Sequence, residues 1–359
     1  MAFFLIFLMM FYCVVNTRPV KAAEDSWETM ADMPTGRLGP GVAVVKGKIY
    51  VIGGMCVDFL NTNEEYDPVT DTWATKTSMP TPRAGFATAV YQNKIYVIGG
   101  GGDFFVDEVT GANEVYDPLT DTWETKTQMP TAREFLCANV VNGKIYLIGG
   151  SKPVNLNDPS FVPNVNEVYD PVSNSWTTKT PPPTQVSGYA SAVVDNKIFI
   201  IGGSPVGNLT QIYHPETDTW SYGAPLPHAC WGAAAGATTG VWAPKRIYVL
   251  GGHPTFNLNQ VYDPETDIWT MGAQMPTNRY GLGVAVVNAI LYAVGCSGSP
   301  DNKKNERYTP FGFPVSGPTP PIEPFPTWIV AATVIIAVVA SSLVVYFVKV
   351  KKTTREAEK

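Results

Sequence analysis

Arginine and glutamate recur at matched places in this chain. Four arginines each follow a tryptophan by ten residues: Arg37, Arg83, Arg133 and Arg279. If the fold places these four guanidinium groups around one opening, they could clamp a ligand carboxylate with paired hydrogen bonds. The same four segments carry a glutamate two residues before a recurrent tyrosine: Glu64, Glu114, Glu167 and Glu306.

Two further segments lack both charges. They have Val186 and Cys230 at the arginine position, and Gln211 and Gln260 at the glutamate position. Partly buried charges need partners, so this joint change favours four structural ion pairs. A ligand clamp made by the arginines stays open as the alternative.

Aromatic residues gather in the segments that vary between repeats. Phe104 and Phe105 follow a repeated Gly pair, whereas Phe135, Tyr189, Trp231 and Tyr280 follow the arginine position. Aromatic rings around a concave mouth suit sugar faces or peptide side chains. They could equally pack the loops onto one another, because much exposed apolar surface is structural.

Catalytic constellations are sparse. The chain has three histidines, and Glu134 and His253 are the only acid or base candidates placed near the expected mouth. Each could also be an ordinary loop residue. We expect no metal and no cofactor.

A rigid unit carries all these residues. KIYVIGG stands at 48–54 and 94–100, and KIYLIGG stands at 144–150. A tyrosine precedes a tryptophan by seven residues in five units, and only the segment between the Gly pair and this tyrosine varies freely in length. A repeat of this kind determines the architecture of the whole domain.

Each unit of 44 to 53 residues holds four β-type stretches, the first two separated by turns such as NGK or QNK. This is the content of a propeller blade. The sixth unit lacks a fourth strand after Tyr308, whereas SWETM at 26–30 is a fourth strand with no partners before it. We therefore predict an all-β protein with six blades, closed by pairing the strand of Trp27 with the strand of Tyr308.

The Gly pair, the tyrosine-bearing strand and the spaced Tyr and Trp resemble the kelch-repeat β-propeller family over residues 26–310. Two enzymes of this fold frame the functional alternatives that the resemblance implies. The two His, two Tyr and crosslinked Cys of a galactose oxidase copper site cannot be assembled here. A sialic acid mutarotase would need an acid or base such as Glu134 or His253.

The two ends of the chain predict a membrane protein. Residues 1–22 resemble a signal peptide, and the propeller follows at 23–310. A Pro-rich stalk at 311–327 leads to the uncharged stretch 328–348, long enough for a transmembrane helix. The basic tail 349–359 would be cytoplasmic. We expect a single-pass cell-membrane protein with an extracytoplasmic propeller.

Cysteine and glycan sites depend on that compartment. Cys56 and Cys296 follow the second strands of blades that neighbour each other in a closed ring, so they could form a disulfide. Cys137 and Cys230 would stay unpaired. Asn208 begins the only glycosylation sequon.

Charge limits the class of partner. Residues 23–348 hold 18 basic and 29 acidic residues, which disfavours nucleic acid and anionic lipid. The sequence predicts a membrane-anchored binding or adhesion module for a protein or carbohydrate. The alternative is an envelope carbohydrate-active enzyme, such as a mutarotase of the sialic acid type.

Overall fold

The computed structural model describes residues 23–103, 108–152, 164–295 and 303–314, and every regular element in them is a β-strand. The signal, most of the stalk, the apolar stretch 328–348 and the tail lie outside these residues. Within the described ranges, no helix has the length and hydropathy needed to cross a bilayer.

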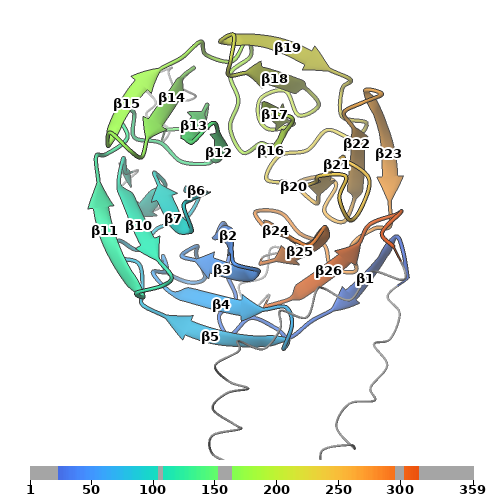
Figure 1. The fold of residues 1–359 in the computed structure, drawn as a ribbon, viewed down its shortest axis with the longest axis horizontal. Coiled ribbons are helices and arrows are strands. Elements are labelled where there is room, and N and C mark those ends of the chain that lie inside the picture. Colours follow the sequence, from blue (N-terminus) through green and yellow to red (C-terminus); the bar gives the residue numbers. More distant parts are fainter. Residues whose placement is uncertain (1–22, 104–107, 153–163, 296–302, 315–359) are drawn as a thin grey trace, which may run out of the picture. The chain divides into compact units, whose positions relative to one another are not determined.

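Six antiparallel four-stranded sheets stand around a central axis (Figure 1). Blade 1 is β2 (Gly41–Val45), β3 (Lys48–Ile52), β4 (Asn63–Asp67) and β5 (Thr72–Lys76). Blade 2 is β6 (Ala87–Tyr91), β7 (Lys94–Ile98), β10 (Asn113–Asp117) and β11 (Thr122–Lys126). Blade 3 is β12 (Cys137–Val141), β13 (Lys144–Ile148), β14 (Asn166–Asp170) and β15 (Ser175–Thr178).

Blade 4 is β16 (Ala190–Val194), β17 (Lys197–Ile201), β18 (Thr210–His214) and β19 (Thr219–Gly223). Blade 5 is β20 (Ala234–Thr238), β21 (Arg246–Leu250), β22 (Asn259–Asp263) and β23 (Ile268–Gly272). Blade 6 is β24 (Gly283–Val287), β25 (Ile290–Val294), β26 (Asn305–Thr309) and β1 (Ser26–Thr29). A short hairpin, β8 (Gly101–Asp103) with β9 (Glu108–Val109), extends the second loop of blade 2.

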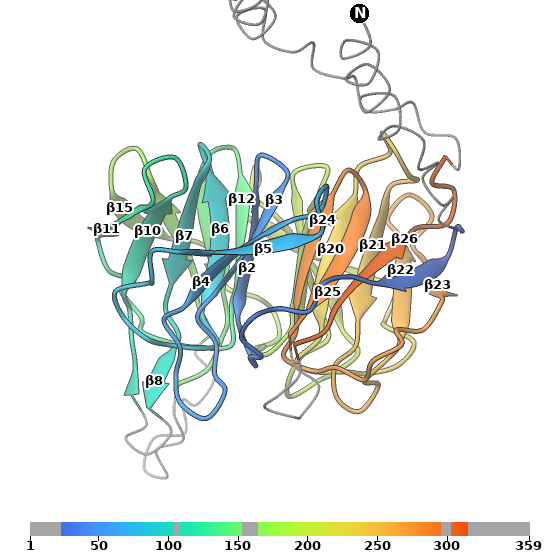
Figure 2. The ribbon, with the colours of Figure 1, turned by 90° about the horizontal axis from the view of Figure 1, so that it is seen from below.

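The loops between the second and third strands of the blades emerge on one face of the ring, which we call the variable-loop face. Figure 2 shows β8 projecting from that face in an edge-on view. The segments that join one blade to the next return to the axis on the same face. The first-to-second strand turns lie opposite, and Gln92 and Asn93 have positive φ there, as a type I′ hairpin turn requires.

The predicted closure is confirmed. β1 pairs antiparallel with β26, and Trp27 lies opposite Tyr308 in the register. The indole of Trp27 donates from Nε1 to the carbonyl of Ala273 in blade 5, at 2.8 Å. The first described strand thus completes the last sheet and also contacts the preceding one.

The core lies between blades. An aromatic ring on the second strand of each blade meets a buried tyrosine of a neighbouring blade, with centroids 5.7 to 6.0 Å apart. The pairs are Tyr50–Tyr116, Tyr96–Tyr169, Tyr146–Tyr213, Phe199–Tyr262, Tyr248–Tyr308 and Tyr292–Tyr66. No blade buries these rings alone, so the repeat works only as a closed ring.

Candidate ligand-binding site

A belt of six backbone hydrogen bonds surrounds the axis on the variable-loop face. In each blade, the N–H of one residue just before the first strand donates to the carbonyl of its counterpart in a neighbouring blade, at 2.7 to 3.1 Å. The six members are Gly39, Gly85, Phe135, Gly188, Gly232 and Gly281. All six have positive φ, the left-handed region that glycine enters at little cost.

Phe135 is the exception in this belt. Its φ is +52°, and its side chain is 49% exposed. The ring covers the neighbouring belt residue, because a Cβ built on Gly85 would lie 3.2 Å from Phe135 Cδ1. A non-glycine residue in this conformation is uncommon and often marks a functional position.

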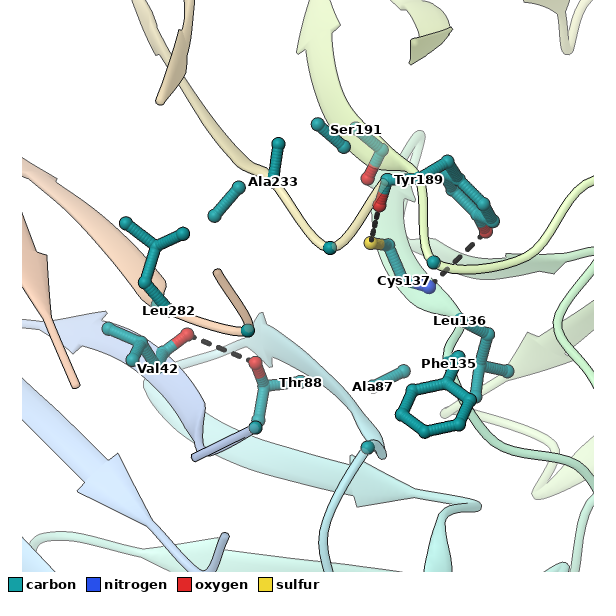
Figure 3. A pocket seen from close by; sticks show the side chains of 18 of the residues that line it. Val42, Ala87, Thr88, Phe135, Leu136, Cys137, Tyr189, Ser191, Ala233 and Leu282 are labelled. Atoms are coloured by element: carbon teal, nitrogen blue, oxygen red, sulfur yellow. Dashed lines mark hydrogen bonds between the residues drawn. The ribbon is translucent and has the colours of Figure 1, made fainter. Parts of the chain in front are cut away.

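A cavity of about 340 Å³ begins at the belt and is walled by the first strands (Figure 3). Small side chains and peptide groups make most of its lining. Thr88 donates from Oγ1 to the carbonyl of Val42 at 3.0 Å, and Cys137 donates from Sγ to the carbonyl of Tyr189 at 3.4 Å. The volume is at the small end of ligand pockets.

The residue before each belt position forms the rim of the mouth. In five blades this rim residue makes an isolated β-bridge to the residue that directly follows the Gly pair. The bridges are Leu38–Met55, Ala84–Gly101, Glu134–Ser151, Ser187–Ser204 and Trp231–His253, and Tyr280 holds the rim position in blade 6. The backbone is therefore repeated around the mouth, whereas the side chains differ in every blade.

Blades 5 and 6 place four aromatic rings in a closed circuit, which we call the aromatic quartet: Trp231, His253, Phe256 and Tyr280. Ring centroids are 5.6 Å apart for Trp231–His253 and 5.3 Å for His253–Phe256. They are 6.1 Å apart for Phe256–Tyr280 and 6.0 Å for Trp231–Tyr280. Three of the four contacts are edge-on, a favoured arrangement for aromatic pairs.

The quartet is open to solvent on one side. Trp231 is 46% exposed, His253 is exposed, and Phe256 and Tyr280 are half-buried. Trp231 and Tyr280 also lean over the belt, because Cβ atoms built on Gly188 and Gly232 would lie 4.0 Å and 3.9 Å from them. The quartet therefore stands beside the mouth of the cavity.

The polar edges of the quartet have no hydrogen-bond partner in the described part of the chain. This holds for Trp231 Nε1, the Tyr280 hydroxyl and the His253 imidazole. The six tryptophans of the repeat differ, since each donates from Nε1 to a neighbouring blade's carbonyl: Trp27, Trp73, Trp123, Trp176, Trp220 and Trp269. Trp231 thus lacks the anchoring bond that marks a structural tryptophan here.

The four arginines lie below the rim and do not reach solvent. Arg37, Arg83, Arg133 and Arg279 are each at most 1% exposed. Each forms an ion pair with the glutamate of its own blade: Glu64 at 2.6 Å, Glu114 at 2.5 Å, Glu167, and Glu306 at 2.9 Å. The expectation that these groups could clamp a ligand carboxylate is wrong, because burial leaves no donor accessible at the mouth.

Neutral side chains replace this pairing in blades 4 and 5. Gln211 accepts from the N–H of Thr184 at 2.9 Å and donates to its carbonyl at 3.0 Å. Gln260 makes the same two bonds with His228. In the charged blades the glutamate instead accepts from a threonine hydroxyl, as Glu64 does from Thr35 at 2.7 Å.

Burial dominates the electrostatics of these pairs. It lowers the pKa of the Arg133 guanidinium, and the carboxylate of Glu167 opposes that shift. The guanidinium remains charged, because arginine starts from a very high pKa. Removing one partner would leave the other buried and uncompensated.

Tyr189 is also a packing residue and not a rim residue. It is 3% exposed, and its hydroxyl donates to the carbonyl of Ile148 and accepts from the N–H of Cys137. Burial raises the pKa of this hydroxyl. Tyr189 is therefore not part of the exposed rim, although it lines the cavity (Figure 3), and its contact with a ligand stays a prediction.

The two acid and base candidates come from different blades, with blade 4 between them. Glu134 is half-buried in blade 3, and His253 belongs to the quartet in blade 5. No group of three or more His, Cys, Asp or Glu side chains among the described residues could hold a metal. Phe104, Phe105 and Cys296 lie outside the described residues, so the Cys56–Cys296 disulfide stays a prediction. Cys137 and Cys230 are unpaired thiols.

Comparison with known proteins follows this geometry. A model described as the KLHDC2/KLHL20/DRC7 Kelch-repeats domain matches residues 12–150, and two Kelch motif models match residues 132–183 and 185–227. No curated protein matches the chain in sequence. The solved structure of YjhT is similar at a TM-score of 0.64 and 16% identity, over 77% of this chain and 95% of that one. At this identity the likeness concerns the fold alone. Together with the closed ring of six sheets, the matches show that the chain belongs to the kelch-repeat β-propeller family.

Proposed function

We propose that the propeller is a binding module whose ligand docks on the variable-loop face, beside the mouth of the cavity. The observation that carries the proposal is the aromatic quartet. Packing alone would satisfy the polar atoms of such rings, as it does for the six half-buried tryptophans of the repeat. Trp231 differs, since 46% of its surface is exposed and its Nε1 lacks a partner in the described chain.

We also propose that the module is displayed outside the cell on a membrane anchor. The support is in the sequence: the uncharged stretch 328–348 is followed by Lys349, Lys351 and Lys352. A propeller held off the membrane by the Pro-rich segment 311–327 would be free to meet a ligand on another surface. Protease treatment of intact cells tests this topology, and a propeller protected from protease would contradict it.

The binding test uses the propeller alone. All six sheets and the belt are complete within residues 23–314, which belong to one compact unit. This fragment is screened against glycans and extracellular proteins, together with the variant Trp231→Ala/Tyr280→Ala. The control is Tyr222→Ala, an aromatic residue on the outer strand β19 that is 56% exposed. We expect only the double variant to lose the ligand, and equal binding by all three proteins would contradict this site.

An envelope carbohydrate-active enzyme is the second candidate. Its support is that a carboxylate, Glu134, holds one rim position, while His253 bridges another rim residue, Trp231. A mutarotase requires such a group to move a proton during ring opening. Sugar mutarotation measured by exchange NMR tests this candidate. Turnover that disappears in Glu134→Gln or His253→Ala would favour the enzyme over the binding module.

A further inference from the structure

We infer that the aromatic quartet is a stacking subsite for an uncharged sugar ring, presented as part of a neutral oligosaccharide. This inference rests on the proposed binding function and names the ligand class of the same site. It starts from the partly exposed rings of Trp231, His253 and Tyr280, whose polar edges have no hydrogen-bond partner among the described residues.

The chemistry of a pyranose matches this surface. One face of such a ring presents C–H groups, which pack on an aromatic face, and hydroxyl groups project from its perimeter. Indole Nε1–H donates a hydrogen bond, whereas a tyrosine hydroxyl and a neutral imidazole can each donate and accept. Trp231, Tyr280 and His253 thus offer a stacking face bordered by three groups that a hydroxyl could satisfy.

The packing within the quartet holds this surface in place. Phe256 contacts both His253 and Tyr280 edge-on, and Trp231 exchanges two backbone hydrogen bonds with His253, at 2.9 and 3.1 Å. The rings therefore need little ordering when a ligand arrives, which favours affinity. A flat ligand gains more from such a fixed face than a flexible peptide side chain does.

Charge separates neutral sugars from acidic ones. Every arginine in the described chain is committed: four are buried with glutamates, and Arg246 and Arg307 pair with Asp263 and Glu28. Residues 23–348 carry an excess of eleven acidic residues, from 18 basic and 29 acidic ones. A sugar carboxylate would therefore meet no available guanidinium and an unfavourable field. We accordingly expect discrimination against sialic acid.

The test is a titration of the propeller, residues 23–314, with mannohexaose, cellohexaose and maltohexaose, followed by calorimetry and by tryptophan fluorescence. N-acetylneuraminic acid is the charged comparison. We expect saturable binding of at least one neutral oligosaccharide. Trp231→Ala should weaken it by about tenfold or more, the loss typical of a central aromatic contact. Tyr280→Phe, which removes only the hydroxyl, should weaken it by a smaller factor, and Tyr222→Ala should leave it unchanged.

Two outcomes would overturn the inference. One is that none of the neutral oligosaccharides binds while Trp231→Ala abolishes binding of a protein ligand found in the screen; the binding module would then stand and its sugar specificity would fail. The other is sugar binding that Trp231→Ala and Tyr280→Phe leave unchanged, which would place the sugar elsewhere. Far-ultraviolet circular dichroism of each variant confirms that the loss is not unfolding.

Discussion

Phe135 carries a backbone conformation that its five counterparts reserve for glycine. Its φ of +52° lies in the left-handed region, which is unfavourable for a residue with a β-carbon. Since half of its ring is exposed, replacing it removes little packing. Phe135→Gly relieves the strain of the left-handed conformation but also increases the conformational entropy of the unfolded chain. We expect the net effect to raise the free energy of unfolding by about 1 kcal/mol. Urea denaturation of the propeller measures this.

The matched control for Phe135 lies in the next blade. A Cβ on Gly188 would have room, because its nearest neighbour atom would be 3.7 Å away, yet its φ is +59°. Gly188→Ala should therefore lower the free energy of unfolding by about 1 kcal/mol through conformation alone. If both substitutions destabilised the protein equally, strain at Phe135 would not be the cause.

Cys230 shows the opposite situation, a reactive type of side chain made inert by its surroundings. The residue is 2% exposed, and burial raises the pKa of its thiol to about 11. A raised pKa means less thiolate at pH 8, and the thiolate is the nucleophile. We expect iodoacetamide to leave Cys230 unmodified in the folded protein and to alkylate it fully in urea, as read by peptide mass spectrometry. Rapid alkylation without urea would show that this site opens.

At the scale of the blade, the same buried positions hold an ion pair in some blades and neutral side chains in others. Blade 3 buries Arg133 with Glu167, whereas blade 4 has Val186 and Gln211 at these positions. Arg133→Val alone leaves a buried carboxylate without its partner and should cost about 3 to 5 kcal/mol of unfolding free energy. The double variant Arg133→Val/Glu167→Gln copies blade 4 and should recover about 2 kcal/mol of that loss, because a buried neutral amide is less costly than an unpaired charge.

Thermal denaturation of the two variants, compared at one temperature, measures the coupling between these positions. A double variant no more stable than Arg133→Val would mean that valine and glutamine do not fill the space that the guanidinium and carboxylate occupy in blade 3. Blades 3 and 4 would then differ at these positions in side-chain shape and not in charge.

The blades also show which features a sequence can predict. Tyr and Trp seven residues apart must lie opposite each other across a tight turn, as Tyr66 and Trp73 do, so strands and register were predictable. The belt was missed, although its signal was present: five of the six units have glycine two residues after the arginine position. The quartet could not be predicted, since contacts between Trp231, His253 and Tyr280 depend on loop conformations that no periodic pattern encodes.

At the scale of the whole molecule, an outer belt complements the inner one. In every blade, the side-chain oxygen of a residue with positive φ accepts two hydrogen bonds. One comes from a tyrosine hydroxyl of its own sheet, and the other comes from a backbone N–H of the adjacent blade. These residues are Asp25, Asp71, Asp121, Asn174, Asp218 and Asp267. Five of them lie between the third and fourth strands of a blade, and Asp25 alone comes from the other end of the chain.

Asp25 therefore decides whether the outer belt closes. Its Oδ1 accepts from the Tyr308 hydroxyl at 2.6 Å and from the Ala273 N–H at 2.7 Å, joining blades 5 and 6. Asp25→Ala removes both bonds and should lower the free energy of unfolding by about 2 kcal/mol. Asp25→Asn should cost less than about 0.5 kcal/mol, because Asn174 makes the equivalent two bonds in blade 3 at 2.7 and 2.9 Å. Urea denaturation separates the cases: equal losses in both variants would mean that charge, and not the paired hydrogen bonds, closes the ring.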